Sequence, residues 1–234
     1  PEGYQLPDID FGDRSFSNIN FLPDGNICLG EHLVGEEYQA PPDRPLGTSL
    51  PFMPGTDRYG EGHVCKFTPE GEFIAEYATE THGGLPGFLG VTSSTLAPDG
   101  KTLVYCSELG NRLFRYDLDA DAQLPDLVTY PPESGYMAMT CVYQPDGTLL
   151  HVKANFREGF FLDVLDADGN ATRTYETAGS GWAAIGPSID GKTIFIGNFP
   201  TGEFIKLDLD SGESVAQADT GVKRGLAGIA QYPG

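Results

Sequence analysis

Four Asp-Gly turns of this 234-residue chain share one setting, in which a β-rich run precedes the turn and an apolar run follows it. The turns end at Gly25, Gly100, Gly147 and Gly191, and the last three glycines are 47 and 44 residues apart. Glycine accepts the positive φ that a tight hairpin turn needs, so each turn predicts a pair of antiparallel strands. Gly25 and Gly100 are 75 residues apart, which is one repeat plus an insertion. We place that insertion at residues 36–62, which are rich in Pro, Gly and Asp.

A second series of turns divides each repeat, at residues 69–71, 119–121, 166–169 and 210–212, and a further β-rich run lies on either side of each turn. Each repeat therefore predicts four short strands, which we name A to D in chain order. A period in the forties with four strands per repeat is typical of a β-propeller, whose radial four-stranded sheets are called blades. We expect an all-β fold with four whole antiparallel blades in one domain over residues 1–234. The alternative, a β-sandwich, would not repeat its turn chemistry at a fixed spacing.

Both ends of the sequence carry what looks like part of a repeat. Residues 226–232 resemble an A strand, and residues 5–9 resemble a D strand. Gly3 to Gly25 and Gly212 to Gly234 are each 22 residues, the spacing of the corresponding turns inside a whole repeat. We therefore expect this chain to be a fragment of a longer protein with five to seven blades. A degenerate last blade is the alternative.

The charge balance excludes two classes of partner. The chain has 34 acidic and 14 basic residues and a formal net charge of −20. Nucleic acids and anionic membranes attract Lys/Arg patches, so neither is expected as a partner. No apolar run is long enough to span a bilayer. We expect a soluble acidic protein, and the compartment stays open between the cytoplasm and a processed secreted form.

The B strands end in polar residues that differ from blade to blade. Aligning these strands by their apolar residues brings one set of side chains to one equivalent position, near the face formed by the B–C and D–A loops: Glu31, Ser107, Lys153 and Asn198. Loops of all blades converge on that face, so it is where a propeller usually binds ligands. Asn111 lies beside this set, and Trp182 begins an A strand near the channel mouth. The alternatives are that strand ends are polar in any protein and that Trp182 packs between blades.

Three of the four histidines lie near the first blade. His32 follows Glu31, His63 follows the insertion, and His82 lies in a D–A loop. Together with Glu31 they could form a site of nitrogen and oxygen ligands for a divalent cation. A loop histidine is more often only solvated. His151 lies among apolar B-strand residues and is expected to be a core or inter-blade residue.

The cysteines fall in predicted strands: Cys28, Cys65, Cys106 and Cys141. Cys28 and Cys65 belong to adjacent strands of one blade, so a disulfide between them is conceivable. Buried free thiols are the simpler expectation. There is no Cys-x-x-Cys pair to indicate a zinc cluster.

Two segments carry a family resemblance. Residues 97–105 and 110–119 resemble blades of the regucalcin/gluconolactonase family, and they are also similar to NHL-repeat and virginiamycin B lyase-like propellers. Residues 18–31 with 62–76 look most like the lyase-type blade. The resemblance to gluconolactonases implies a divalent metal held on the channel axis by a Glu, an Asn and an Asp. The Pro-Asn-Gly and Glu-Gly-Pro motifs of that family are absent here. Asn18 is the one residue that carries over, because it stands at the matching start of the A strand of blade 1.

Two functions follow as hypotheses. The first is a metal-dependent hydrolase or lyase, of the gluconolactonase kind, that acts on a small lactone or ester in the channel. Its catalytic residues would be Glu31 and Lys153, its metal (Ca, Mg or Zn) ligands Asn18, Glu31, His32 and His82, and its ligand-binding residues Ser107, Asn111, Asn198 and Trp182. The second is a non-catalytic propeller that binds a protein or a glycan on its loop face. In either case the partner is a small molecule, a protein or a glycan.

Overall fold

The computed structural model describes residues 16–34, 62–80, 88–107, 109–177, 181–223, 225–226 and 228–231. Blade 1 contains β1 (Phe16–Phe21), β2 (Ile27–Val34), β3 (Val64–Phe67) and β4 (Phe73–Tyr77). Blade 2 contains β6 (Ser93–Leu96), β7 (Thr102–Cys106), β8 (Arg112–Asp117) and β9 (Ala122–Thr129). Blade 3 contains β10 (Met137–Tyr143), β11 (Leu149–Asn155), β12 (Gly159–Leu165) and β13 (Ala171–Thr177). Blade 4 contains β14 (Trp182–Pro187), β15 (Thr193–Asn198), β16 (Glu203–Asp208) and β17 (Ser214–Asp219).

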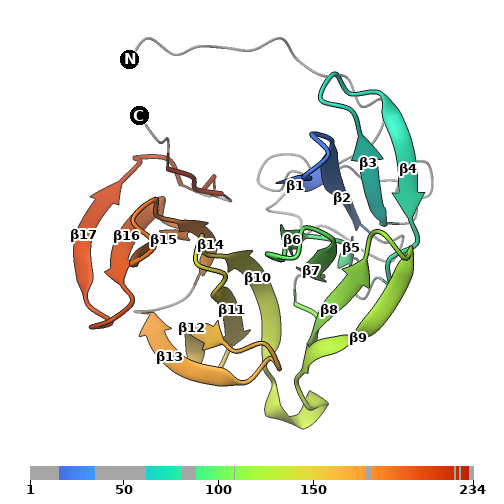
Figure 1. Cartoon of the computed structure of the whole chain (residues 1–234). Coiled ribbons are helices and arrows are strands. Elements are labelled where there is room, and N and C mark those ends of the chain that lie inside the picture. The colour runs from blue at the N-terminus through green and yellow to red at the C-terminus, as the bar shows by residue number, and fades with distance from the viewer. Residues whose placement is uncertain are drawn as a thin grey trace.

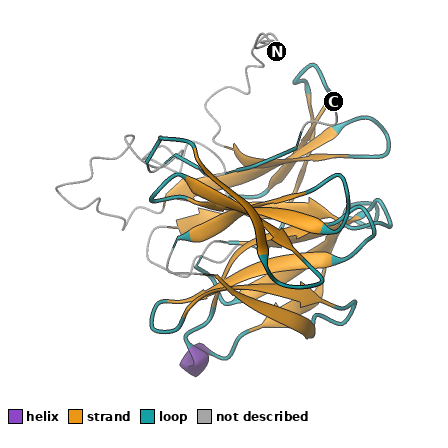
Figure 2. Ribbon diagram, turned by 90° about the vertical axis from the view of Figure 1, so that its left-hand side faces the viewer, coloured by secondary structure: helices purple, strands orange, loops and turns teal. Residues whose placement is uncertain are grey.

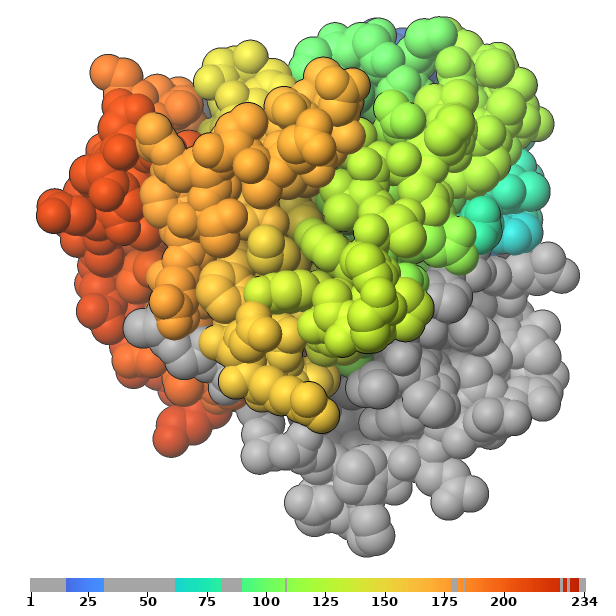
Figure 3. All heavy atoms as spheres, turned by 90° about the horizontal axis from the view of Figure 1, so that it is seen from below, coloured from blue at the N-terminus to red at the C-terminus, as the bar shows by residue number. Residues whose placement is uncertain are grey.

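The four sheets are arranged as blades around a common centre. In every blade the strands pair in chain order and antiparallel. Figure 1 shows the first strand of each blade innermost and the fourth at the rim. Viewed from below, blades 2, 3 and 4 follow one another in chain order (Figure 3). The β-propeller predicted from the repeat is confirmed.

Helix is almost absent from this fold. Among the described residues it is confined to one 3-10 turn, η2 (Pro132–Ser134), drawn in purple in Figure 2. No helix in the described ranges has the length and apolar character that crossing a bilayer requires.

Hydrophobic cores lie between neighbouring blades. The core between blades 1 and 2 joins Cys28 and Val64 to Leu103 and Tyr105, whose ring stacks on Phe114. Two further clusters fill the seams between blades 2 and 3 and between blades 3 and 4. Blades 2 and 3 bury both faces against neighbouring blades, so their second and third strands are largely buried, and the outermost strands are more exposed. β17 accordingly has all six residues exposed.

Polar side chains link the inner strands to one another. The Ser94 hydroxyl donates to Asn18 Oδ1, and Asn18 Nδ2 donates to the Val91 carbonyl at 3.2 Å. The Ser93 and Thr140 hydroxyls are hydrogen bonded at 2.9 Å in the next seam. Strands of different blades are not paired in one sheet, so these bonds fix how successive blades are aligned.

The Asp-Gly turns also hold the blades in place. A Cβ built on Gly100, where φ is +74°, would lie 2.8 Å from the Pro23 ring of the preceding blade. Asp24 of the first turn accepts from Lys66 Nζ at 2.6 Å, and Asp190 of the fourth turn accepts from Lys206 Nζ at 3.2 Å. The hydrogen bond from Lys66 lowers the pKa of Asp24 to about 2. The Asp-Gly turn that predicts the hairpin therefore also contacts residues outside that hairpin, in the third strand of its own blade or in the preceding blade.

One strand is longer than predicted. We expected the second strand of blade 1 to end at Glu31, but β2 continues to Val34. Its last residues pair with β5 (Phe88–Gly90), which precedes the first strand of blade 2. Backbone hydrogen bonds to a segment far along the chain sustain the extension, and no local sequence signal reports such a partner.

The predicted partial repeats have different outcomes. Residues 5–9, the predicted D strand, and residues 36–61 of the insertion lie outside the described residues. Leu226 and residues 228–231, predicted as an A strand, have no strand hydrogen bonding. Leu226 nevertheless lies against Gly197 as Val91 lies against Gly30, so this segment occupies the place that the next blade's inner strand takes elsewhere. Its position was predicted correctly and its secondary structure was not.

All four cysteines are buried, and none of them is in a disulfide: Cys28, Cys65, Cys106 and Cys141. The conceivable disulfide is not formed, because Cys28 is opposite Lys66 and Cys65 is opposite Leu29. Neighbouring positions on a strand point to opposite faces, so the two thiols lie on different sides of blade 1. Burial raises the pKa of Cys28 to about 12, which keeps this thiol protonated and unreactive.

Candidate functional site

Strand pairing supports the predicted equivalence of the four B-strand residues. Glu31, Lys153 and Asn198 pair with Phe16, Ala138 and Trp182, and in each case the inner strand skips one residue just beyond that pair. Ser107 follows β7 at the corresponding point, because Cys106 pairs with Ser93. The following polar residues therefore occupy equivalent positions in the four blades: Glu31, Ser107, Lys153 and Asn198.

Glu31 is the most unusual member of this set. Its side chain is fully buried, with 0% of the residue exposed. Its N–H donates to the His63 carbonyl at 2.9 Å, and its carbonyl accepts from Val91 N–H at 2.8 Å. Glu31 thus lies where β2 leaves its pairing with β3 and joins the neighbourhood of blade 2. Moving a carboxylate out of water is costly, so such a group is expected to have a specific role.

Lys153 belongs to a buried ion pair. Its Nζ lies 2.7 Å from Asp163 Oδ2, and the two side chains are 16% and 3% exposed. Thr174 donates a second hydrogen bond to Asp163 at 2.6 Å. The Lys153 ammonium also lies 5.2 Å from the centre of the Tyr136 ring and 5.9 Å from that of Phe161. This candidate catalytic lysine is therefore held by a carboxylate and two aromatic faces.

The other predicted ligand-binding residues have structural contacts. Ser107 is buried, and its hydroxyl donates to the Gly90 carbonyl at 2.6 Å. Asn198 is buried, and its side-chain oxygen accepts from Thr201 N–H at 3.2 Å. Trp182 is 6% exposed and packs in the core between blades 3 and 4, as the inter-blade alternative predicts.

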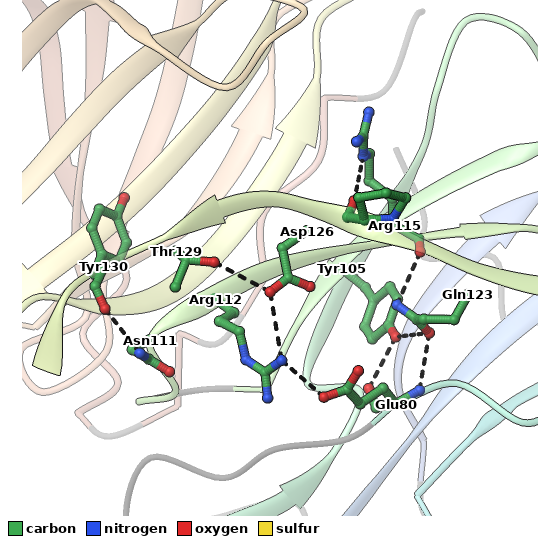
Figure 4. A network of polar contacts seen from close by, with 10 residues as sticks. Glu80, Tyr105, Asn111, Arg112, Arg115, Gln123, Asp126, Thr129 and Tyr130 are labelled. Carbon is green, nitrogen blue, oxygen red and sulfur yellow. Dashed lines mark hydrogen bonds and ion pairs between the residues drawn. The ribbon is translucent and has the colours of Figure 1, made fainter.

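Asn111 belongs to a polar network on the outer part of blade 2 (Figure 4). Its Nδ2 donates to the Tyr130 carbonyl at 2.8 Å, and Tyr130 N–H donates back to the Asn111 carbonyl at 2.8 Å. In the same network Arg112 lies 2.8 Å from Glu80, which follows the last strand of blade 1. Asn111 therefore joins two segments of blade 2.

The structure describes only some of the predicted metal ligands. The amide of Asn18 is engaged within the protein, because its oxygen accepts from Ser94 and its nitrogen donates to Val91. His63 Nδ1 lies 2.9 Å from Glu76 Oε1. His32 is within β2, and its side chain and the whole of His82 lie outside the described residues. Across the described ranges, no group of three potential ligands is close enough to hold a metal ion.

A second buried polar cluster was not predicted. His151 is fully buried, as expected for an inter-blade residue, and its ring stacks on Tyr130 of blade 2 with centroids 6.0 Å apart. Its Nδ1 is 3.0 Å from the Thr140 carbonyl, while Nε2 has no hydrogen-bond partner among the described residues. His151 pairs across the sheet with Asp163, so it adjoins the Lys153 ion pair. Burial lowers the pKa of His151 to about 4, so the ring is neutral near pH 7.

Asp163 is the residue of this cluster that the sequence reasoning missed. It is the one charged residue in the run 159–165, which is otherwise glycine and apolar. An acid in a strand of that kind is a signal of a buried partner. The partner could be named only with the register, which sets Asp163 opposite His151 and one diagonal step from Lys153.

Comparison with known proteins gives structural matches only. No protein-family model matches the chain, and no curated protein matches its sequence. Hydrazine synthase from Kuenenia stuttgartiensis matches with a TM-score of 0.55 and 15% identity, over 92% of this chain and 52% of that one. A catalytically inactive variant of virginiamycin B lyase from Staphylococcus aureus, solved with quinupristin, matches with a TM-score of 0.57 and 14% identity, over 88% of this chain and 56% of that one.

The chain has a β-propeller fold of the virginiamycin B lyase type. At 14% identity the likeness extends to the fold alone, as the resemblance of its blades predicts. The chain spans about half the length of the solved structures that it matches.

Proposed function

We propose that this propeller is an enzyme that opens a small lactone or ester, by hydrolysis or by elimination, at the B-strand ends. The observation that carries the proposal is Glu31, a fully buried carboxylate at a position where the other blades have Ser107, Lys153 and Asn198. A propeller offers one such position per blade around one centre, so different polar groups can act on one ligand. The two structural neighbours are both described as enzymes, and one of them is a lyase.

The chemistry asks for a base and for stabilisation of negative charge. Glu31 would act as the general base. In hydrolysis it would remove a proton from water; in elimination it would remove a proton from the carbon next to the one that carries the leaving oxygen, so that a C=C bond forms as the C–O bond breaks and the carboxylate leaves. Lys153 is the candidate for stabilising the developing oxyanion, from within its ion pair with Asp163. Ser107 and Asn198 would line the ligand position. A dry site strengthens each of these interactions, which suits the burial of Glu31.

A divalent cation belongs to the metal-dependent form of this proposal. Glu31 and His82 would hold it. His32 directly follows Glu31 within β2, where neighbouring positions point to opposite faces, so the two do not belong to one ligand set. Asn18 is left out because both ends of its amide are hydrogen bonded within the protein. Such an ion would polarise the scissile carbonyl. Elemental analysis of the purified protein, before and after dialysis against EDTA, tests this form separately from the general one.

The general proposal is tested by assaying small lactones and aryl esters with the purified chain. Suitable substrates are γ-butyrolactone, glucono-δ-lactone and p-nitrophenyl acetate. Glu31→Gln is expected to lower kcat/KM at least about 100-fold, the usual contribution of a general base. Glu76→Gln is the matched control, because Glu76 is a surface acid of the same blade whose partner is His63. Equal activity of Glu31→Gln and the wild type would contradict the proposal.

A second candidate is a propeller that binds a protein or glycan without catalysis. It is favoured by Phe156, which is 69% exposed in the turn after β11, at the end of blade 3 where Lys153 lies. Exposed aromatic side chains are frequent anchors in interfaces. If the chain is inactive on all ester substrates, glycan-array binding that Phe156→Ala removes would support this alternative.

A further inference from the structure

A groove of about 420 Å³ opens between blades 1 and 2. It lies beside the first Asp-Gly turns of the two blades, at the opposite end of β2 from Glu31. Its lining includes Asp24, Lys66, Tyr77, Lys101, Leu118 and Asp119. The volume falls in the range of small-molecule sites, about 300–1,000 Å³. Because the groove is separate from the B-strand ends, a ligand bound in it is independent of the proposed function.

Tyr77 offers a hydroxyl to this groove. The residue is 9% exposed, and its ring packs edge-on against Tyr116 at 5.9 Å. The Tyr77 hydroxyl makes no hydrogen bond to the described residues, whereas the Tyr116 hydroxyl donates to Asp121 at 2.7 Å. Burial raises the pKa of Tyr77, so its hydroxyl is neutral and can both donate and accept.

Charged groups of both signs line the same groove. Lys66 lies 2.6 Å from Asp24, and Lys101 lies 3.1 Å from Asp117. An ammonium has three donors and a carboxylate about four acceptor positions, so each pair keeps capacity for further hydrogen bonds. The carboxylate of Asp119 has no ion-pair or hydrogen-bond partner within the described part of the chain, which adds an uncommitted acceptor. The groove lining therefore offers both donors and acceptors, and Leu118 adds an apolar side chain to it.

We propose that this groove binds a neutral polyhydroxylated small molecule, such as a monosaccharide or a cyclitol. An anion would meet the carboxylates of the lining and of a protein with a net charge of −20. A cation would meet Lys66 and Lys101. Adjacent hydroxyl groups can instead donate to a carboxylate and accept from an ammonium at once, and their C–H face can rest on Leu118.

Saturation-transfer NMR followed by calorimetric titration tests this site. The probes are glucose, galactose and myo-inositol, with protonated glucosamine and gluconate as charged comparators. We expect at least one neutral probe to bind, and both charged comparators to bind more weakly. Tyr77→Phe keeps the ring and removes one hydrogen bond, so it should weaken binding about five-fold. Asp119→Asn should weaken binding of the same probe to a similar degree.

The matched control is Asp168→Asn. Asp168 holds the corresponding place in the turn of blade 3, since its N–H donates to Asp166 as the Asp119 N–H donates to Asp117. Binding should be unchanged in this variant. Failure of every neutral probe to bind would overturn the proposal, as would equal binding of a charged comparator. Binding that survives both Tyr77→Phe and Asp119→Asn but is lost in Glu31→Gln would also overturn it, because the ligand would then lie at the B-strand ends.

Discussion

His151 is a titratable side chain that the fold holds neutral. It lies between blades 2 and 3, with Asp163 and Lys153 on its own sheet and Tyr130 stacked on its ring. Desolvation dominates, because the pKa falls to about 4 although Asp163 acts in the opposite direction. The neutral ring is therefore compatible with the fold near pH 7, whereas its protonation in acid would destabilise the folded state.

The pH dependence of stability follows from this shift. Unfolded His151 takes up a proton near its ordinary pKa of 6.5, while folded His151 does so only near 4. Stability is therefore complete above about pH 6.5 and is lost as the pH falls toward 4, by up to about 3 kcal/mol. His151→Gln should remove this part of the loss, which urea unfolding at about pH 7 and pH 4.5 measures. A wild type and variant with the same pH dependence would contradict the assignment.

Gly100 is constrained by its backbone and by its neighbour. Its φ is +74°, and a Cβ would lie 2.8 Å from the Pro23 ring. Gly25 has a φ of +85° and open space around the Cβ position, so Gly25→Ala is a control for backbone strain alone. We expect Gly25→Ala to cost about 1–2 kcal/mol, the penalty for a left-handed residue, and Gly100→Ala to cost more. Chemical denaturation measures the free energy of unfolding of both variants. Equal losses would mean that Pro23 moves away from the new Cβ of residue 100 without loss of stability.

At the scale of elements, the seam between blades 2 and 3 depends on the Lys153–Asp163 pair. With both side chains largely buried, Lys153→Met would leave the Asp163 carboxylate without its cation. Removing one partner of a buried pair costs about 3–5 kcal/mol, whereas replacing both with apolar groups of similar size is often tolerated. We expect the double variant Lys153→Met, Asp163→Leu to be more stable than Lys153→Met alone. A double-mutant cycle in urea tests this, and additive losses would show that the pair is not coupled.

The segment that follows blade 4 packs closely against that blade because Gly186 has no side chain. A Cβ on Gly186 of β14 would lie 2.1 Å from the Ile229 carbonyl oxygen. Ser188 also donates to the Gln231 side chain at 2.9 Å. Gly186→Val should release residues 228–231, which hydrogen exchange detects as lost protection. Gly228→Ala has open space at its Cβ position and should leave protection unchanged. Unaltered hydrogen exchange in Gly186→Val would show that residues 228–231 do not depend on the close contact at Gly186.

How far the sequence predicts each feature depends on where the information lies. The hairpins were predictable because Asp-Gly chemistry is local, as in the turn that ends at Gly147. Glu31 and Lys153 could be aligned because each follows a run of apolar B-strand residues. Contacts between blades could not be read in this way. The hydrogen bond from Ser94 to Asn18 joins residues 76 positions apart, and no local pattern reports that Asn18 links the inner strands of two blades.

The whole molecule is an acidic ring whose turns carry much of the charge. Asp24 and Asp190 have lysine partners, whereas the side chain of Asp146 accepts from the Thr148 backbone. The two paired acids are held ionised, since hydrogen bonds lower the pKa of both. Each blade brings a similar acidic turn to the same end of the fold, so mutual repulsion grows with every repeat.

Stability should therefore rise with salt. A net charge of −20 destabilises the compact state, and the Debye length falls from about 30 Å at 0.01 M to about 8–10 Å near physiological ionic strength. We expect the melting temperature to rise between low salt and several hundred millimolar NaCl. The ion pairs of Lys66 and Lys206 would be weakened by the same screening, but exposed pairs contribute at most about 1 kcal/mol each. Sucrose is the control, because it strengthens burial without screening charge. A melting temperature that is flat or falls with NaCl would mean that the acidic groups are spaced too widely for their repulsion to limit stability.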